Sequence, residues 1–230
     1  MQDILLKVRQ ELAENKGFGG IDKFFKQEIK KRGVKTAIVR KIAKNYFPKK
    51  CSKKEVFSLC ENLLSSGYSE EATIAFQWVL RMKNQFSKDD FNIFEKWLKK
   101  YIDNWAKCDD FMTHAFSELL FQFPELINKV KKWINSKNRW QRRASAVVFI
   151  PLISKEKKYL KHVFEIALKL LKDKDDMVQK GYGWLLKEAS RDFQKDVFQF
   201  VMGHKKEMPR TALRYAIEKM PVSLKRRAMS

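Results

Sequence analysis

Apolar residues recur at spacings of three and four over most of this chain, and this helical periodicity restricts the possible fold more than any other feature. One stripe in the stretch FNIFEKWLKKYI consists of Phe91, Phe94, Trp97, Leu98 and Ile102. A second stripe, in HVFEIALKLL, consists of Val163, Ile166, Ala167, Leu170 and Leu171. Strand-like alternation is not found between the turns, and only 8 Gly and 5 Pro serve tight turns. The pattern predicts an all-α fold.

The sequence also has an internal period. The segments GYSEEATIAFQW, DNWAKCDDFMTH, NRWQRRASAVVF and DDMVQKGYGWLL are led by the large residues Tyr68, Trp105, Trp140 and Met177, at steps of 37, 35 and 37 residues. Each segment is predicted to open a helix that pairs with the helix before it, a unit size typical of HEAT-type repeats. We expect one HEAT-like repeat domain over residues 1–230, clearest over 68–190, in which one helix of each pair lines the concave side of a solenoid.

The charge is strongly unbalanced. Lys and Arg number 49 against 27 Asp and Glu, a formal net charge of +22. Such an excess favours a polyanionic partner, nucleic acid before an anionic membrane surface, so we expect the concave side to be a basic DNA-binding groove. Solvated lysines without a specific site are the alternative. No apolar run approaches the ~18 residues of a membrane span, and the first residues indicate an amphipathic helix rather than a signal peptide.

Several kinds of chemistry have no support in the sequence. Cys51, Cys60 and Cys108 are dispersed without a CxxC motif, and the three histidines are scattered, so neither a disulfide framework nor a metal site is expected. A reducing, cytoplasmic compartment, with the protein associated with the nucleoid, fits this cysteine usage. Nucleotide-binding loops of the GxxxxGK[ST] or GxGxxG type do not occur, so nucleotide hydrolysis and dinucleotide binding have no support.

Trp105 and Asp109 lie one helical turn apart in NWAKCDDF. Asp109 has two structural interpretations, a helix N-cap or an ion pair with Arg143. Its functional interpretation is electrostatic, because a carboxylate can stabilise the positive charge that develops on a sugar when a glycosidic bond breaks. A cationic alkylated purine leaves as a neutral base, so a single carboxylate suffices. Asp110, about 100° further round the helix, is expected to face solvent or to cap.

Trp184 is predicted to share a surface with Trp105, where an indole face can hold a sugar edge or a cationic base. Arg143 can bind a phosphate bidentately, and Lys180 and Lys187 flank Trp184 on its helix. The alternative for each of these cations is a solvated charge. The remaining tryptophans are predicted to lie in the core, and they are Trp78, Trp97, Trp133 and Trp140.

With these residues the chain resembles the DNA alkylation repair family, the AlkD-like HEAT-repeat alkylpurine DNA glycosylases. The resemblance covers most of the chain and is best in RGVKTAIVRKIAK, DNWAKCDD, FPELINKVKKWINSKNRWQRRASAVVF and MVQKGYGWLLKEASR. The Trp-x-x-x-Asp motif of the family falls on Trp105 and Asp109. Its arginine falls on Arg143, and its second tryptophan falls on Trp184, which a basic residue, Lys187, follows.

The resemblance implies a monofunctional glycosylase that hydrolyses the N-glycosidic bond of N3- and N7-alkylated purines in duplex DNA, as a monomer without metal or cofactor. It also implies that the damaged nucleotide is held through its sugar and backbone, with the base left near the stack. Two positions depart from the family. In the segment GVKTA, Lys35 stands in place of a glutamine, and Phe24 stands in place of a tyrosine. Lys35 and the adjacent Thr36 are expected to contact DNA.

Two other functions stay open. One is a non-catalytic HEAT-repeat protein that recognises damaged or branched DNA, because helical-repeat scaffolds can lose their chemistry and keep their groove. The other is a scaffold for an acidic protein partner.

Overall fold

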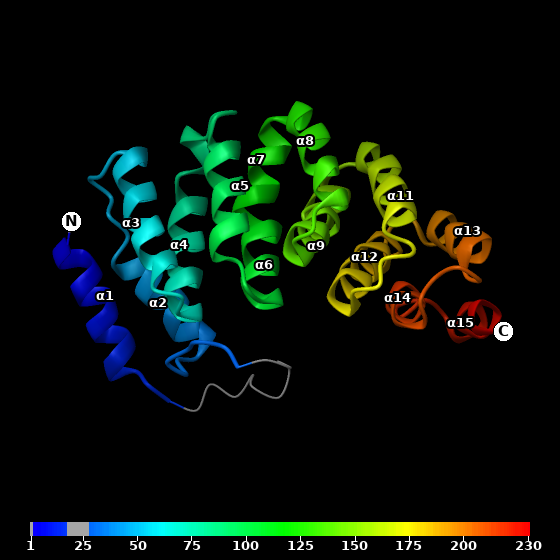
Figure 1. Ribbon diagram of the computed structural model, residues 1–230, viewed down its shortest axis with the longest axis horizontal. Coiled ribbons are helices and arrows are strands. Elements are labelled where there is room, and N and C mark those ends of the chain that lie inside the picture. The colour runs from blue at the N-terminus through cyan, green and yellow to red at the C-terminus, as the bar shows by residue number, and fades with distance from the viewer. Residues whose placement is uncertain (1, 18–27) are drawn as a thin grey trace. The chain divides into compact units, whose positions relative to one another are not determined.

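The structure is a computed structural model that describes residues 2–17 and 28–230 (Figure 1). Every regular element in these ranges is a helix, which confirms the all-α prediction. The chain divides into two compact units, Met1–Leu119 (unit 1) and Leu120–Ser230 (unit 2). Phe24 lies outside the described residues, and the expected role of that position stays a prediction.

Unit 1 is built from helices. The helices are α1 (Gln2–Glu14), α2 (Thr36–Asn45), α3 (Lys53–Ser65), α4 (Ser69–Arg81), the 3-10 helix η2 (Lys83–Gln85), α5 (Asp90–Tyr101), α6 (Trp105–Phe111), the π-helical turn η3 (Met112–Phe116) and α7 (Ser117–Gln122), in which the boundary between the units falls. The amphipathic helix expected at the start of the chain is therefore α1.

The core of unit 1 is an aromatic cluster. The stripe predicted along α5 is buried as expected, from Phe91 to Ile102. Its side chains meet Phe111 at the end of α6, which lies 5.3 Å from Phe94 between ring centroids and stacks on Phe76 of α4 at 4.7 Å. Because burying an aromatic side chain stabilises the fold by about 2–3 kcal/mol, this cluster fixes α6 against α4 and α5.

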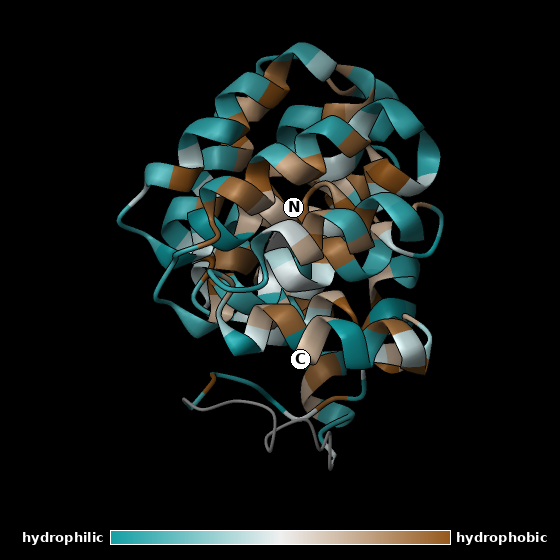
Figure 2. Cartoon of the chain, turned by 90° about the vertical axis from the view of Figure 1, so that its right-hand side faces the viewer, coloured by the Kyte–Doolittle hydropathy of each residue, from teal (hydrophilic) through white to brown (hydrophobic). Residues whose placement is uncertain are grey.

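Unit 2 continues with shorter elements. They are η4 (Pro124–Leu126), α8 (Ile127–Lys131), η5 (Lys132–Asn135), α9 (Arg139–Val147), α10 (Ile150–Lys155), η6 (Lys157–Tyr159), α11 (Leu160–Lys169), α12 (Asp176–Ala189), α13 (Gln194–His204), α14 (Arg210–Ala216) and α15 (Val222–Met229). The stripe predicted along α11 is buried. Hydrophobic and hydrophilic residues form separate stripes along the helices, as their amphipathic sequences require (Figure 2).

Helix α12 is tightly packed in unit 2, and one glycine permits this. A Cβ atom on Gly183 would lie 2.7 Å from Cβ of Tyr215 and 3.0 Å from the carbonyl oxygen of Ala212, both on α14. These distances are too short for non-bonded atoms. Any larger residue at position 183 would therefore push α12 and α14 apart.

Helix starts follow the predicted period in both units, and the HEAT-type unit itself stays a prediction. Each leading residue stands within two residues of a helix start, at α4, α6, α9 and α12, and each of these helices follows the earlier helix of its pair, at α3, α5, α8 and α11. The short polar residue before α12 caps it, since the side chain of Asp175 accepts the N–H groups of Met177 and Val178. The basic concave groove and the single domain over 1–230 stay predictions.

Candidate functional site

Asp109 lines a pocket of about 520 Å³ that lies entirely within unit 1. The pocket is formed by the segment before α2, by α2 itself, by the first turns of α4 and by the helical run that begins with α6. Its lining residues are Ile29, Lys31, Gly33, Val34, Lys35, Thr36, Val39, Arg40, Ser69, Glu70, Thr73, Ala106, Lys107, Asp109, Asp110, Thr113 and His114. The structure thus brings together three of the predicted site residues, Lys35, Thr36 and Asp109.

Helix α6 presents Asp109 from its interior. The helix is capped by Asn104, whose side-chain oxygen accepts the N–H of Lys107 at 3.0 Å. Asp109 therefore lies in the body of the helix, and the alternative that it is an N-cap is wrong. The other alternative, an ion pair with Arg143, concerns residues of two different units and stays a prediction.

After α6 the helix widens into the π-helical turn Met112–Phe116, in which the N–H of Ser117 donates to the carbonyl oxygen of Met112. Such turns are rare in proteins, and many of those that occur lie at functional sites. The hydroxyl of Thr113 donates to the carbonyl oxygen of Asp109 at 2.6 Å, and Nδ1 of His114 lies 2.9 Å from the carbonyl oxygen of Asp110. Because a carbonyl oxygen only accepts, the second contact assigns the proton to Nδ1.

Asp110 is a second carboxyl group in the pocket. The prediction that it faces solvent or caps a helix is wrong, because its side chain is 16% exposed and its residue lies within α6. Burial raises its pKa, and the charge of Asp109 acts in the same direction, whereas His114, Thr73 and Arg40 act to lower the pKa. Asp110 is thus less readily ionised than an ordinary aspartate, a property that sequence reasoning missed.

Cations stand at the other side of this pocket. Lys35 and Arg40 are exposed, and Lys35 precedes the first turn of α2. No side chain among the described residues caps α2, so its first N–H groups carry the positive end of the helix dipole. Lys107 is different, because its buried ammonium group donates to the carbonyl oxygen of Gly67 and pairs with Asp103 at 2.9 Å.

Two buried glutamates hold the segment before α2 in place. Oε1 of Glu70 accepts the backbone N–H groups of Arg32, Gly33 and Val34 at 2.9, 2.8 and 3.2 Å. Glu71 is fully buried and pairs with Nε of Arg9 at 3.0 Å and with a terminal nitrogen of Arg32 at 2.6 Å. The wall of the pocket that carries Lys35 and Thr36 is therefore fixed by carboxylates of α4.

Arg143 belongs to unit 2 and is 5% exposed. One of its terminal nitrogens donates to the carbonyl oxygen of Met177, at the start of α12. Its path crosses Gly181, where an added Cβ would lie 3.1 Å from Cγ of Arg143. The guanidinium group is thus built into the contact between α9 and α12, and its expected contact with a phosphate stays a prediction.

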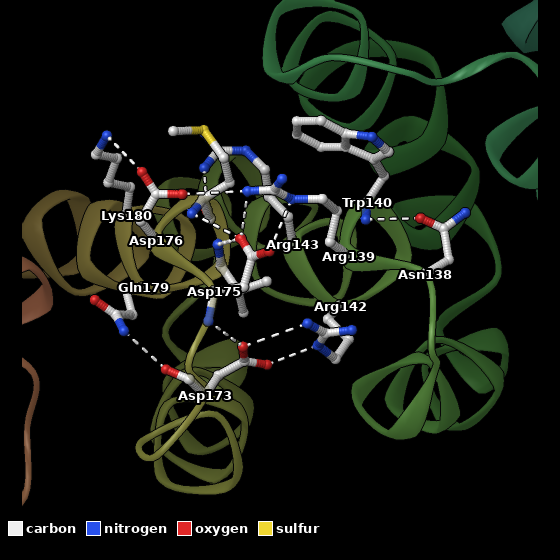
Figure 3. Close-up of polar contacts among 12 residues, drawn as sticks. Asn138, Arg139, Trp140, Arg142, Arg143, Asp173, Asp175, Asp176, Gln179 and Lys180 are labelled. Atoms are coloured by element: carbon white, nitrogen blue, oxygen red, sulfur yellow. Dashed lines mark hydrogen bonds and ion pairs between the residues drawn. The ribbon is translucent and has the colours of Figure 1, made fainter. Parts of the chain in front are cut away.

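The neighbouring arginines contact the same turn (Figure 3). Arg139 pairs with Asp175 at 2.8 Å and with Asp176 at 3.2 Å, and Arg142 pairs with Asp173 at 2.7 Å. Asp175 therefore caps α12 and binds α9 at the same time. The basic segment RWQRR, in which only Arg143 is predicted to bind a phosphate, is in the structure largely an ion-pair partner for the acidic start of α12.

The other predicted residues of unit 2 lie along α12. Trp184 is partly exposed, and its indole N–H donates to Oε1 of Glu188 at 3.1 Å. Lys187 pairs with Glu218 at 3.3 Å, and Lys180 pairs with Asp176 at 3.4 Å. Trp105, in unit 1, is also partly exposed. A joint surface of Trp105 and Asp109 with the residues of α12 stays a prediction.

The core prediction for the tryptophans is confirmed at three of four positions. Trp78, Trp97 and Trp133 are buried, but Trp140 is partly exposed, so the prediction for Trp140 is wrong. Trp140 lies in the first turn of α9, at the end of a helix, and the guanidinium group of Arg139 lies 5.3 Å from its ring centroid. An aromatic residue at this position of the repeat can therefore cover a helix end instead of filling the core.

Residues 2–17 and 28–230 contain no group of three or more histidine, cysteine, aspartate or glutamate side chains arranged to hold a metal ion. In the same ranges no helix is both long enough and apolar enough to cross a membrane.

These observations define an all-α helical-repeat protein of high positive charge, with two adjacent carboxyl groups in a pocket beside exposed cations. The chain belongs to the DNA alkylation repair enzyme family, whose model matches residues 8–220. No curated protein matches the chain. Its fold is similar to that of a solved structure described as a predicted DNA alkylation repair enzyme from Enterococcus faecalis, with a TM-score of 0.72 at 14% identity over 96% of each chain.

Proposed function

We propose that this protein is a monofunctional DNA-alkylpurine glycosylase that hydrolyses the N-glycosidic bond of cationic N3- and N7-alkylated purines in duplex DNA. Membership of the DNA alkylation repair enzyme family supports the repair of alkylation damage. The observation that carries the finer proposal is the position of Asp109, a carboxyl group in the interior of α6 that lines the pocket together with the exposed Lys35.

The reaction requires little from the protein beyond a negative charge at the sugar. An N3- or N7-alkylated purine carries a positive charge, so it leaves as a neutral base when the C1′–N9 electron pair moves to the ring. The sugar then carries the positive charge. The Asp109 carboxylate stabilises that charge and orients the water that adds to C1′. The base need not leave the stack, because no group has to protonate it. Trp105 and Trp184 contribute indole faces against the sugar and backbone.

Phosphate binding positions the substrate without reading its sequence. In the pocket this role falls to Lys35 and Thr36, because the start of α2 offers N–H groups and a helix dipole beside an exposed ammonium group. Lys180, Lys187 and Arg143 supply the corresponding cations of unit 2. The net charge of +22 supports association with duplex DNA as the partner. In this proposal the protein binds DNA as a monomer.

The test is release of 7-methylguanine from methylated duplex DNA by the wild type and by Asp109→Asn. The carboxamide keeps the shape of the side chain and removes its charge, so we expect near-wild-type DNA affinity and a loss of base release of at least 100-fold. Asp192→Asn is the matched control, because it removes the same charge from an exposed position in unit 2.

Each outcome decides between functions. Release by Asp109→Asn at the wild-type rate would remove Asp109 from the mechanism. Tight DNA binding by the wild type without release of any base would instead favour the non-catalytic DNA-binding alternative.

A further inference from the structure

Asp110 has a position that the proposed function does not use. The release of a cationic purine needs one carboxylate, yet the same pocket contains a second carboxyl group on the adjacent residue. Its Oδ1 atom is buried and, among the described residues, has no partner in hydrogen-bond geometry. Burial of a carboxyl oxygen that lacks a hydrogen bond is costly, so such a group is usually neutral or serves a function.

The surroundings of Asp110 suit an acid that is re-protonated from solvent. Nδ1 of His114 lies 3.3 Å from Oδ1 of Asp110, and the imidazole side chain is 39% exposed. His114 is held in this place by the contact of Nδ1 with the carbonyl oxygen of Asp110 at the π-helical turn. A proton can thus pass from water to His114 and on to Asp110 without opening the pocket.

We propose that Asp110 is a general acid that extends the substrates of this site to purine lesions with a neutral base, such as hypoxanthine or 1,N6-ethenoadenine. This inference rests on the proposed glycosylase function of Asp109. A neutral purine is a poor leaving group, because its ring would leave as an anion. A proton delivered to a ring nitrogen removes that barrier, which is the usual task of the second carboxyl group in glycoside hydrolysis.

The step balances as a simple hydrolysis. The carboxyl proton of Asp110 moves to N7 or N3 of the purine, and the C1′–N9 electron pair then moves to the ring, so the base departs neutral. The sugar cation is stabilised by Asp109. Water adds its hydroxyl group to C1′, and the remaining proton returns to the Asp110 carboxylate, directly or through His114. The products are the free base and an abasic site, and no other reactant is consumed.

The groups that face Asp110 from the packed elements set its ionisation. They are Arg40 of α2, Thr73 of α4, Asp109 of α6 and His114 of the π-helical turn. Burial is the largest influence and raises the pKa of Asp110, with a smaller contribution in the same direction from Asp109. The group is therefore protonated to a higher pH than an ordinary aspartate, as a general acid requires.

The experiment compares two duplexes that differ only in one lesion, hypoxanthine or 7-methylguanine, and scores the ratio of the two release rates. We expect the wild type to release both bases. We expect Asp110→Asn to lower the ratio of hypoxanthine to 7-methylguanine release at least tenfold, because a general acid contributes about 10²–10⁴ in rate. Asp109→Asn should lower both rates and serves to separate the two roles.

A second measurement does not depend on the folding of a variant. For the wild type, the hypoxanthine rate should fall as the pH rises through the pKa of Asp110, and the 7-methylguanine rate should lack that fall. Failure of the wild type to release hypoxanthine while it releases 7-methylguanine would overturn this proposal alone. An unchanged ratio in Asp110→Asn, or parallel pH profiles, would also overturn it. Failure to release 7-methylguanine would overturn the proposed function.

Discussion

The contact between α12 and α14 gives the sharpest prediction about the fold. Gly183→Ala adds a Cβ atom 2.7 Å from Cβ of Tyr215 and 3.2 Å from Cα of Ala212, and both of these atoms are fixed to the backbone of α14. The helices must separate, and overpacking of this kind costs about 1–3 kcal/mol. Replacing a glycine within a helix by alanine returns about 0.5–1 kcal/mol. The difference is a net loss of stability of about 1–2 kcal/mol.

Gly203→Ala is the matched control. Gly203 lies near the end of α13, is exposed, and has no atom within 4 Å of the Cβ that alanine would add. The same chemical change there should leave stability unchanged or raise it by up to about 0.5 kcal/mol. For a chain of this length each kcal/mol shifts the Tm by about 2–4 °C, so we expect Gly183→Ala to melt about 2–8 °C below the wild type.

The assay is thermal unfolding followed by far-UV circular dichroism, with urea unfolding to confirm the free energies. A Tm for Gly183→Ala equal to or above that of Gly203→Ala would refute the close approach of α12 and α14. Equal losses in the two variants would also refute it, because the argument depends on the difference between a crowded glycine and an open one.

Three further predictions concern charged groups. Glu71→Gln should lower the free energy of unfolding by about 2 kcal/mol, since it leaves Arg9 and Arg32 without their buried carboxylate, and a fully stable variant in urea unfolding would contradict this. Arg143→Ala should lower the slope of log K against log salt for duplex DNA by about 0.9 if its guanidinium group binds one phosphate, whereas a lower Tm with an unchanged slope would assign Arg143 to folding alone. Burial raises the pKa of Asp110, so the unfolded chain releases this proton at a lower pH than the folded chain does. The stability of the wild type should therefore fall relative to Asp110→Asn as the pH rises from about 4 towards the pKa of the folded state. Parallel stability curves from pH 4 to 7 would refute the burial of this carboxyl group.

The helices could be predicted because the local spacing of apolar residues determines their buried faces and nearby polar residues mark their ends. The stripe from Phe91 to Ile102 is buried as its period requires, and Asp175 caps α12 as a short polar residue before a helix does. These features depend on neighbours within one or two turns. The same holds for the period of the leading residues, since each repeat packs mainly against the repeats beside it.

The site could be predicted only in part, because burial of charged groups depends on contacts far away in the sequence. Arg143 is in the expected register, but its burial results from the missing side chain at Gly181 and the carbonyl oxygen of Met177. Asp110 lies mostly buried near Arg40 of α2 and Thr73 of α4, which are distant in sequence, and the π-helical turn beside it has no period that a sequence pattern reveals.

Because the side chain of Arg143 crosses Gly181, the residues at these two positions constrain each other in evolution as well as in packing. With Arg143 present, a mutation to alanine at 181 puts a methyl group 3.1 Å from Cγ of the arginine. Once the arginine is shortened, the same methyl group keeps only an ordinary van der Waals contact, with Cγ2 of Val147 at 3.6 Å. Related chains that have lost the guanidinium group are thus expected to tolerate alanine at position 181, whereas a chain with alanine there must shift the side chain at position 143 by a few tenths of an ångström to regain the arginine.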